Sequence, residues 1–163
     1  MSIQVGDTAP EFSLVSLTAD GPQVVTLNSL TSESNVLLLF VPMAFTGGCT
    51  EEFCAITKSL DAYKVLDAKV VGISGDNPFA QGAWAEKEGI GIPLLSDYEH
   101  KATEAYGIAY ESFIPEANLI MGGVAKRSAF VVDQAGKVRY AEVLENPHDM
   151  PDFDAIQACL KSL

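Results

Sequence analysis

Two uninterrupted apolar runs limit most strongly what this chain can fold into. Residues Asn35–Val41 read NVLLLFV, and residues Lys69–Ser74 read KVVGIS. Such runs are typical of strands that are buried on both faces, as in a parallel sheet. Between the runs, apolar residues recur every three or four positions and predict one helix from Thr50 to about Leu66; they are Phe53, Ile56, Leu60, Tyr63 and Leu66.

The rest of the chain adds shorter strands and helices. We expect strands at Phe12–Leu14, Val24–Leu27 and Ile92–Leu95, helices at 78–88, 99–106 and 152–160, and a hairpin that joins strands 127–133 and 137–143. This order indicates an α/β fold in which a central mixed β-sheet carries helices on both faces and begins with an N-terminal β-hairpin. A length of 163 residues suits a single domain over residues 1–163, and no repeat or linker divides it.

The charge balance and the cysteine count exclude several classes of protein. The chain carries 10 Lys+Arg against 22 Asp+Glu, a formal net charge of −12. Nucleic acids and anionic membranes attract basic surfaces, so we expect neither as a partner. The N-terminus lacks a secretory signal, and the longest apolar run, Val36–Phe45, is half a membrane span. Three cysteines do not suit a disulfide scaffold, and we expect a cytoplasmic protein.

Cys49 is the residue most suited to chemistry. It follows the first buried strand and the pair Gly47-Gly48, at the point where the predicted helix begins. Free N–H groups and the helix dipole favour an anion there, which stabilises a thiolate in an accessible loop. Thr46 lies three residues earlier and can direct its hydroxyl at the sulfur or at an oxygen of a bound substrate. The alternative is that Cys49 packs as a small apolar residue, although Ser, Thr, Asp or Asn would begin a helix better.

A thiolate also favours a nearby cation, and the chain contains few candidates. Residues 1–57 contain no Lys or Arg, and there are only two arginines in the whole sequence. Arg139 has the position of an exposed residue in the second strand of the C-terminal hairpin. Arg127 stands at the start of an apolar strand, from which its guanidinium can reach a neighbouring loop. The alternative for Arg127 is a surface charge at the end of a strand.

The pattern Pro42-x-x-x-Thr46-x-x-Cys49, followed by Arg127, resembles the active-site signature of the peroxiredoxins, which are thiol peroxidases with a thioredoxin-like fold. The resemblance covers nearly the whole chain and looks closest to the bacterioferritin-comigratory (PrxQ) and AhpE-like subgroups. The supporting matches are Gly6-Asp7-x-Ala9-Pro10-x-Phe12, Phe45, Asn77-Pro78-Phe79 with Trp84, Pro93-Leu94-Leu95-Ser96-Asp97 and Lys126-Arg127-Ser128-Ala129-Phe130-Val131-Val132-Asp133-x-x-Gly136.

This resemblance implies a role for each residue of the signature. Cys49 would be the peroxidatic cysteine, which attacks the O–O bond of hydrogen peroxide or an alkyl hydroperoxide and becomes a sulfenic acid. Thr46 and Arg127 would hold the two peroxide oxygens in line and stabilise the departing one. Pro42 would shield the thiolate from water and from over-oxidation. The resemblance implies no metal or organic cofactor, and a thioredoxin- or glutaredoxin-type protein as reductant.

Cys54 resembles the resolving cysteine of the PrxQ subgroup, five residues after the peroxidatic one. Five helical positions separate two Cα atoms by about 8–9 Å. A disulfide tolerates at most about 7 Å, so the first helical turn would have to unwind. The alternative is a core cysteine beside Phe53 and Ile56, and the arginine that often follows a resolving cysteine is absent here. We expect Cys159, on the last helix, to be structural.

Other functions remain open at this point. A one-cysteine cycle would use an external thiol to resolve Cys49, and a redox sensor would use the same cysteine to pass oxidation to a partner. We expect His100 and His148 to be surface residues, and no Cys/His set completes a zinc site. Phe79 and Trp84 either pack in the core or lie at the surface. At the surface they would form, with Phe45, an apolar patch that suits a homodimer; a monomeric protein is the alternative.

Overall fold

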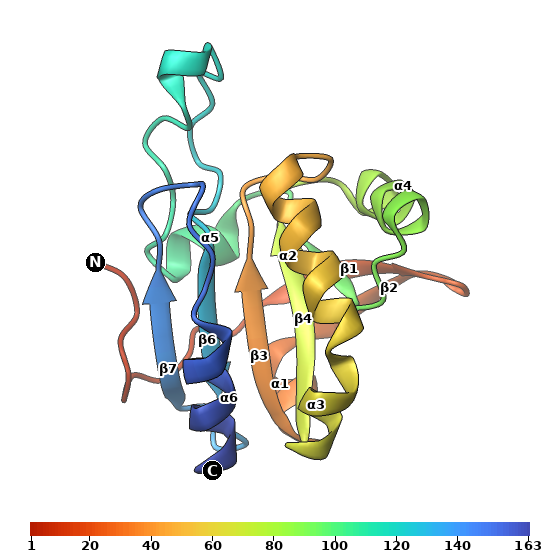
Figure 1. Ribbon diagram of the computed structural model, residues 1–163, viewed down its shortest axis with the longest axis vertical. Helices are drawn as coiled ribbons and strands as arrows, with labels where there is room; N and C mark the ends of the chain where they lie inside the picture. The colour runs from red at the N-terminus through yellow and green to blue at the C-terminus, as the bar shows by residue number, and fades with distance from the viewer.

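The two apolar runs form the parallel centre of a seven-stranded sheet. The computed structural model describes residues 1–163, and in it β3 (Asn35–Phe40) and β4 (Ala68–Ser74) pair in parallel over their whole length. The short strand β5 (Leu94–Ser96) pairs in parallel with β4, on the side away from β3; Figure 1 shows β3 and β4 side by side at the centre. All three strands end at the same edge of the sheet, so the loops that follow them lie near one another.

Antiparallel strands complete the sheet on both sides, in the order β2-β1-β5-β4-β3-β6-β7. The predicted N-terminal hairpin is formed by β1 (Ser13–Thr18) and β2 (Gly21–Thr26), and the C-terminal hairpin by β6 (Ser128–Val132) and β7 (Val138–Val143). Strand β6 pairs antiparallel with β3. The prediction of a mixed sheet with an N-terminal hairpin is therefore confirmed.

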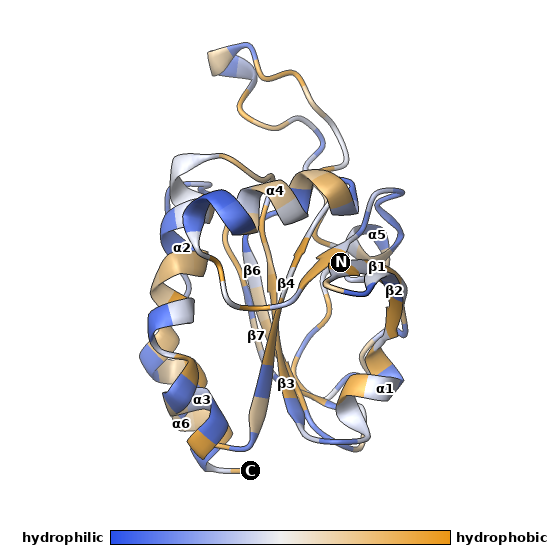
Figure 2. Ribbon diagram, turned by 90° about the vertical axis from the view of Figure 1, so that its right-hand side faces the viewer, coloured by the Kyte–Doolittle hydropathy of each residue, from blue (hydrophilic) through white to orange (hydrophobic).

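Helices cover both faces of this sheet, as Figure 2 shows from the side. One face carries α2 (Gly47–Lys58), α3 (Leu60–Val65) and α6 (Phe153–Lys161), and the other carries α1 (Leu27–Thr31) and α5 (Lys101–Ala105). Helix α4 (Pro78–Glu88) crosses the end of the sheet where the parallel strands stop. No helix is both long enough and apolar enough to span a membrane.

Alternate residues of β3 supply two separate cores. Leu37 and Leu39 pack with residues of α2, α3 and α6, including Phe53 and Ile156. Their neighbours in the strand, such as Leu38, turn to the opposite face and pack with α1, α5 and the antiparallel strands. Because both sets are fully buried, the strand has no polar face, which explains its continuous apolar sequence.

The structure corrects the single helix that the apolar spacing predicts from Thr50 to Leu66. The chain forms α2 and α3, which are separated at Ser59, whose N–H donates to the carbonyl oxygen of Ile56. The Thr57 hydroxyl donates to the carbonyl of Phe53 and accepts from the N–H of Gly91, which ties the end of α2 to the loop after α4. The apolar spacing continues across this break because both helices bury the same side against the sheet.

Several element ends also differ from the prediction, by up to four residues: β1 ends at Thr18 instead of Leu14, and β2 begins at Gly21 instead of Val24. Leu27, expected at the end of a strand, instead begins α1 after Thr26, which caps that helix through its side chain.

Between α5 and β6, residues 109–126 extend away from the sheet and contain the short 3-10 helix η1 (Pro115–Ala117), at the top of Figure 1. Two isolated bridges, Ala109–Ala125 and Phe113–Met121, hold this segment together. The sequence analysis predicts no structure for it.

Candidate active site

Cys49 lies in the first turn of α2, directly after the loop that follows β3. Thr46 is the N-cap residue, and the N–H of Thr50 makes the first helical hydrogen bond, 3.0 Å from the carbonyl oxygen of Thr46. The N–H groups of Gly47, Gly48 and Cys49 therefore belong to the unpaired first turn, which favours a negative charge. The expected accessible loop is not observed: Cys49 is only 2% exposed, because it packs into the core on the α2 face.

Arg127 is the residue just before β6, and its side chain reaches Cys49. Its Nη2 atom lies 3.6 Å from the Cys49 sulfur and donates to the carbonyl oxygen of Pro147 at 3.1 Å. The guanidinium is 2% exposed, so the alternative that Arg127 is a surface charge is wrong. The close approach also explains a glycine in α2, since a Cβ atom at Gly48 would lie 3.1 Å from the same nitrogen. A buried guanidinium therefore lies within 3.6 Å of the Cys49 sulfur.

Glu52 completes the site, and the sequence analysis does not identify it. Its Oε2 atom accepts from Nη1 of Arg127 at 2.5 Å, and both side chains are buried. Burial raises the pKa of Glu52 to about 7, and the pairing with Arg127 opposes this rise only in part. Burial lowers the pKa of Arg127, but Cys49 and Glu52 outweigh it and raise that pKa overall. The buried guanidinium of Arg127 therefore contacts two side chains, Cys49 and Glu52.

A signal for Glu52 does exist in the sequence. Glu52 follows Cys49 by three positions, so both residues lie on the same helical face. Phe53, the next residue, belongs to the apolar side of that helix. A glutamate at the edge of an apolar helical face is rarely buried unless it is paired, and only the fold brings Arg127 to it.

The structure places Thr46 and Pro42 in the loop between β3 and α2. The Thr46 hydroxyl donates to the carbonyl oxygen of Met43 at 2.9 Å. The expected contact with the sulfur is not among its hydrogen bonds, although the lone pairs of the hydroxyl oxygen stay available as acceptors. Pro42 is buried at the start of the loop.

Cys54 and Cys159 lie apart from the reactive position, and all three cysteines are free thiols. Cys54 is half-buried further along α2, with its sulfur 3.5 Å from the carbonyl oxygen of Glu88. Because α2 is continuous from Gly47 to Lys58, Cys54 and Cys49 are separated by about 8 Å along a helix. Cys159 contacts the carbonyl oxygen of Arg139 at 3.5 Å, and burial raises the pKa of its thiol.

The expected aromatic patch is only partly at the surface. Trp84 is fully buried, donates its indole N–H to the hydroxyl of Thr50 at 2.9 Å and packs against Phe53 with ring centroids 5.4 Å apart. Trp84 is therefore a core residue that supports the first turns of α2. Phe45 and Phe79 remain exposed, at 52% and 66%.

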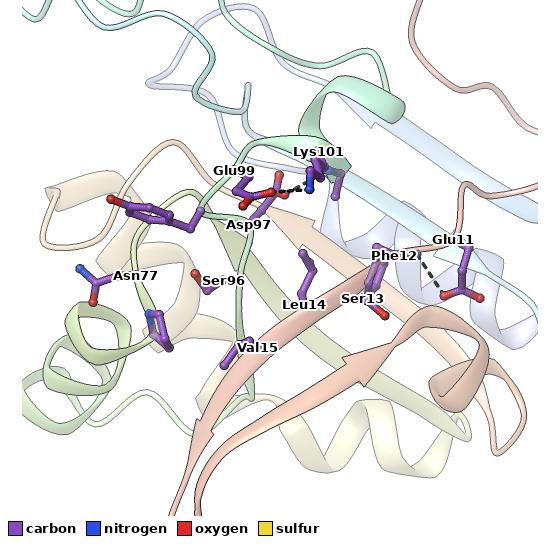
Figure 3. Close-up of a pocket in the computed structure, with 13 residues that line it drawn as sticks. Glu11, Phe12, Ser13, Leu14, Val15, Asn77, Ser96, Asp97, Glu99 and Lys101 are labelled. Carbon is purple, nitrogen blue, oxygen red and sulfur yellow. Dashed lines mark hydrogen bonds and ion pairs between the residues drawn. The ribbon is translucent and has the colours of Figure 1, made fainter.

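The histidines and the cavity that Figure 3 shows lie outside this site. His148 is exposed, but His100 is half-buried and packs over Gly75, where a Cβ atom would lie 2.6 Å from the imidazole; its surface assignment is corrected accordingly. No group of three His, Cys, Asp or Glu residues could hold a metal ion.

A cavity of about 610 Å³ lies between the start of β1 and the beginnings of α4 and α5, and Figure 3 shows the residues that line it. Neither Cys49 nor Arg127 is among them.

A thioredoxin-like α/β fold with a buried cysteine at a helix N-terminus, next to an arginine, is an arrangement that suits a redox enzyme. The model of the AhpC/TSA family matches residues 5–141, and the chain belongs to that family. It is thus a peroxiredoxin, an oxidoreductase that reduces peroxides.

Individual relatives agree with this assignment. The chain is 36% identical to alkyl hydroperoxide reductase E of Mycobacterium tuberculosis (strain ATCC 25618 / H37Rv) over 152 residues, which cover 92% of this chain and 91% of that protein. It is 36% identical to peroxiredoxin Bcp of Escherichia coli (strain K12) over 139 residues, 85% of this chain and 84% of that protein. The crystal structure of peroxidoxin BcpB from Mycobacterium tuberculosis superimposes with a TM-score of 0.82 at 30% identity, over 99% of this chain and 98% of that one.

Proposed function

We propose that Cys49 is the peroxidatic cysteine of this enzyme, and that the chain acts as one domain on hydrogen peroxide and organic hydroperoxides. The observation that carries the proposal is the contact of Arg127 with both the Cys49 sulfur and Glu52. A thiolate at Cys49 attacks the distal oxygen of the hydroperoxide, the S–O bond forms and the O–O bond breaks. The products are a sulfenic acid at Cys49 and an alkoxide or hydroxide, which takes up a proton and leaves as alcohol or water.

The loop residues and Arg127 have complementary roles in this step. Because the Thr46 proton is used by the carbonyl of Met43, the Thr46 oxygen accepts the O–H of the incoming hydroperoxide and orients it. The Arg127 guanidinium stabilises the charge that develops on the departing oxygen. Pro42, which is buried at the start of the same loop, excludes water from the thiolate and limits over-oxidation.

Resolution of the sulfenic acid by Cys54 is the second part of the proposal. The Cys54 sulfur would attack the Cys49 sulfur and release water, which leaves an intramolecular disulfide. Since the two cysteines lie on one continuous helix, the first turn of α2 must unwind to bring them together. A thioredoxin- or glutaredoxin-type donor would then reduce the disulfide, which suits a cytoplasmic location for a chain with three free thiols.

Mass spectrometry after one equivalent of hydrogen peroxide tests both parts. We expect the wild type to lose two hydrogens through a Cys49–Cys54 disulfide, and the Cys54→Ser variant to accumulate a sulfenic acid at Cys49. A sulfenic acid in both proteins would assign resolution to an external thiol and make Cys54 a core residue. An unmodified Cys49 in both would refute the peroxidatic role. Cys159→Ser is the matched control, and we expect it to form the same disulfide as the wild type.

Turnover distinguishes the peroxidase from a redox sensor that uses the same cysteine. With a generic dithiol reductant, a peroxidase consumes many equivalents of peroxide, whereas a sensor reacts once and stops. The exposed Phe45 and Phe79 beside the site suit a homodimer face, with a monomer as the alternative. Sedimentation of the reduced protein separates these two states.

A further inference from the structure

A polar cluster at the end of β4 holds the middle of the loop that carries Pro42 and Thr46. The carboxylate of Asp76 accepts the N–H of Ala44 through Oδ2 at 2.7 Å. The same oxygen accepts the Ser74 hydroxyl, also at 2.7 Å. Asp76 lies 32 residues from Ala44 in sequence, and this hydrogen bond joins the loop after β3 to the end of β4.

Neighbouring side chains fix this carboxylate in place. The Gln81 amide, which is buried, donates to the Ser74 hydroxyl oxygen at 2.9 Å and to the carbonyl oxygen of Leu95 at 2.9 Å. The Ser96 hydroxyl donates to the backbone carbonyl of Asp76 at 2.6 Å. Three elements therefore converge on Asp76: the end of β4, helix α4 and strand β5. A carboxylate restrained in this way is a rigid acceptor for the loop.

The loop has few other hydrogen bonds between its two ends, although Ala44 packs in the core and Phe45 packs against Trp84. At its start, the N–H of Val41 donates to the carbonyl oxygen of Ile73 at 2.9 Å. Near its end, Thr46 bonds to Met43 inside the loop itself. Phe45, in between, has a positive φ of 64°, a conformation that costs a non-glycine residue free energy and must be held by its surroundings. The Asp76–Ala44 hydrogen bond ties the backbone of this strained stretch to the end of β4.

We infer that Asp76 is a positioning residue of the catalytic loop: it keeps Pro42 and Thr46 over Cys49 and opposes the opening of the first turn of α2. This inference rests on the proposed function for the catalytic meaning of the loop. The geometric part of the inference does not, since it concerns only how often the buried Cys49 becomes accessible. Removal of the carboxylate then affects two reactions of the same sulfur in opposite directions.

The test compares alkylation of Cys49 by iodoacetamide with its oxidation by hydrogen peroxide, in the reduced full-length protein at one pH. Alkylation of a residue that is 2% exposed requires the loop to open, so we expect Asp76→Ala to alkylate at least about tenfold faster. We expect oxidation by peroxide to slow by about tenfold, because Thr46 is no longer held in place. Mass spectrometry of the Cys49 peptide follows the alkylation, and Cys159 in the same sample is an internal control.

Conservative and control variants separate positioning from general loosening. Asp76→Asn keeps an acceptor oxygen for Ala44, and we expect both of its rates to stay within about threefold of the wild type. Asp133→Ala removes a carboxylate that accepts three hydrogen bonds in the distant β6–β7 turn, and we expect unchanged rates. If Asp76→Ala does not fold, Ser74→Ala frees the carboxylate by removing one of its two donors and should raise the alkylation rate two- to threefold.

Two results would overturn the inference: an unchanged alkylation rate in Asp76→Ala, or an equal rise in Asp133→Ala. If the wild type does not react with peroxide, the proposed function fails, and the alkylation rates still decide whether Asp76 holds the loop.

Discussion

The buried pair of Arg127 and Glu52 allows a quantitative test of how charge is used in this site. In Arg127→Met, the carboxylate of Glu52 keeps its buried position but loses the guanidinium that lies 2.5 Å away. An uncompensated charge in a protein core costs about 3–5 kcal/mol. We expect the free energy of unfolding to fall by about that amount at pH 8, where Glu52 is ionised in the wild type, whose Glu52 pKa is about 7.

A second substitution separates stability from activity. In the double variant Arg127→Met/Glu52→Leu, two apolar side chains replace the ion pair, an exchange that is often neutral for stability. We expect the double variant to recover to within about 1–2 kcal/mol of the wild type. We also expect both variants to react with hydrogen peroxide about 10²–10³-fold more slowly, because neither contains the cation that we propose to stabilise the departing oxygen.

The chain offers a convenient probe and a matched control. Trp84 is its one tryptophan and is buried against Phe53, so its fluorescence reports urea unfolding. The other arginine, Arg139, pairs with Asp133 but is itself half exposed to water, so we expect Arg139→Met to cost at most about 1 kcal/mol and to leave the peroxide rate unchanged. Stopped-flow mixing with peroxide gives the rate of Cys49 oxidation.

The reasoning is refuted by either of two results. If the double variant is as unstable as Arg127→Met, the loss of stability does not come from the unpaired charge of Glu52. If Arg127→Met oxidises as fast as Arg139→Met, Arg127 has no part in the reaction.

Two further predictions concern residues around the same pair. Because burial raises the pKa of Glu52 from 4.5 to about 7, the folded state binds its proton more tightly than the unfolded state. The stability that this proton contributes is complete below about pH 4.5 and is lost as the pH rises through about 7. Glutamine does not titrate, so over that range the free energy of unfolding of Glu52→Gln, measured with urea, should rise by about 3 kcal/mol relative to that of the wild type. Parallel curves of stability against pH would contradict this. Gly48→Ala places a Cβ atom 3.1 Å from Arg127 Nη2. Peroxide oxidation should slow about tenfold. The free energy of unfolding should change by at most about 1 kcal/mol, because the helical preference of alanine offsets the displacement of the guanidinium. An unchanged rate would show that Arg127 adapts without loss.

Local patterns predicted the sheet well and one helix poorly. The runs in β3 and β4 have only one structural solution, because a strand without a polar face must be covered on both sides. The division of residues 50–66 into α2 and α3 was not predictable from spacing. The apolar side is the same in both helices, and the break depends on the contact of Thr57 with Gly91, a residue 34 positions away.

The candidate active site, too, could be predicted only in part from the sequence. The position of Cys49 after a strand and before a helix marked it as a thiolate candidate, and the resemblance to peroxiredoxins linked it to Arg127. Glu52 was missed because a glutamate on a helix ordinarily faces water. It is buried only because Arg127, 75 residues later, lies against it.

The amino-acid order alone thus decided the features that depend on neighbouring residues: that two apolar runs are buried strands, that a C-terminal hairpin follows them, and where a cysteine meets a helix N-terminus. Tertiary structure decided the features that depend on distances between remote segments. These are the contact of one guanidinium with both Cys49 and Glu52, the raised pKa of that glutamate, and the hydrogen bond from Ala44 to Asp76. Periodicity carries no information on such distances, because desolvation and charge pairing arise only after the sheet brings these segments together.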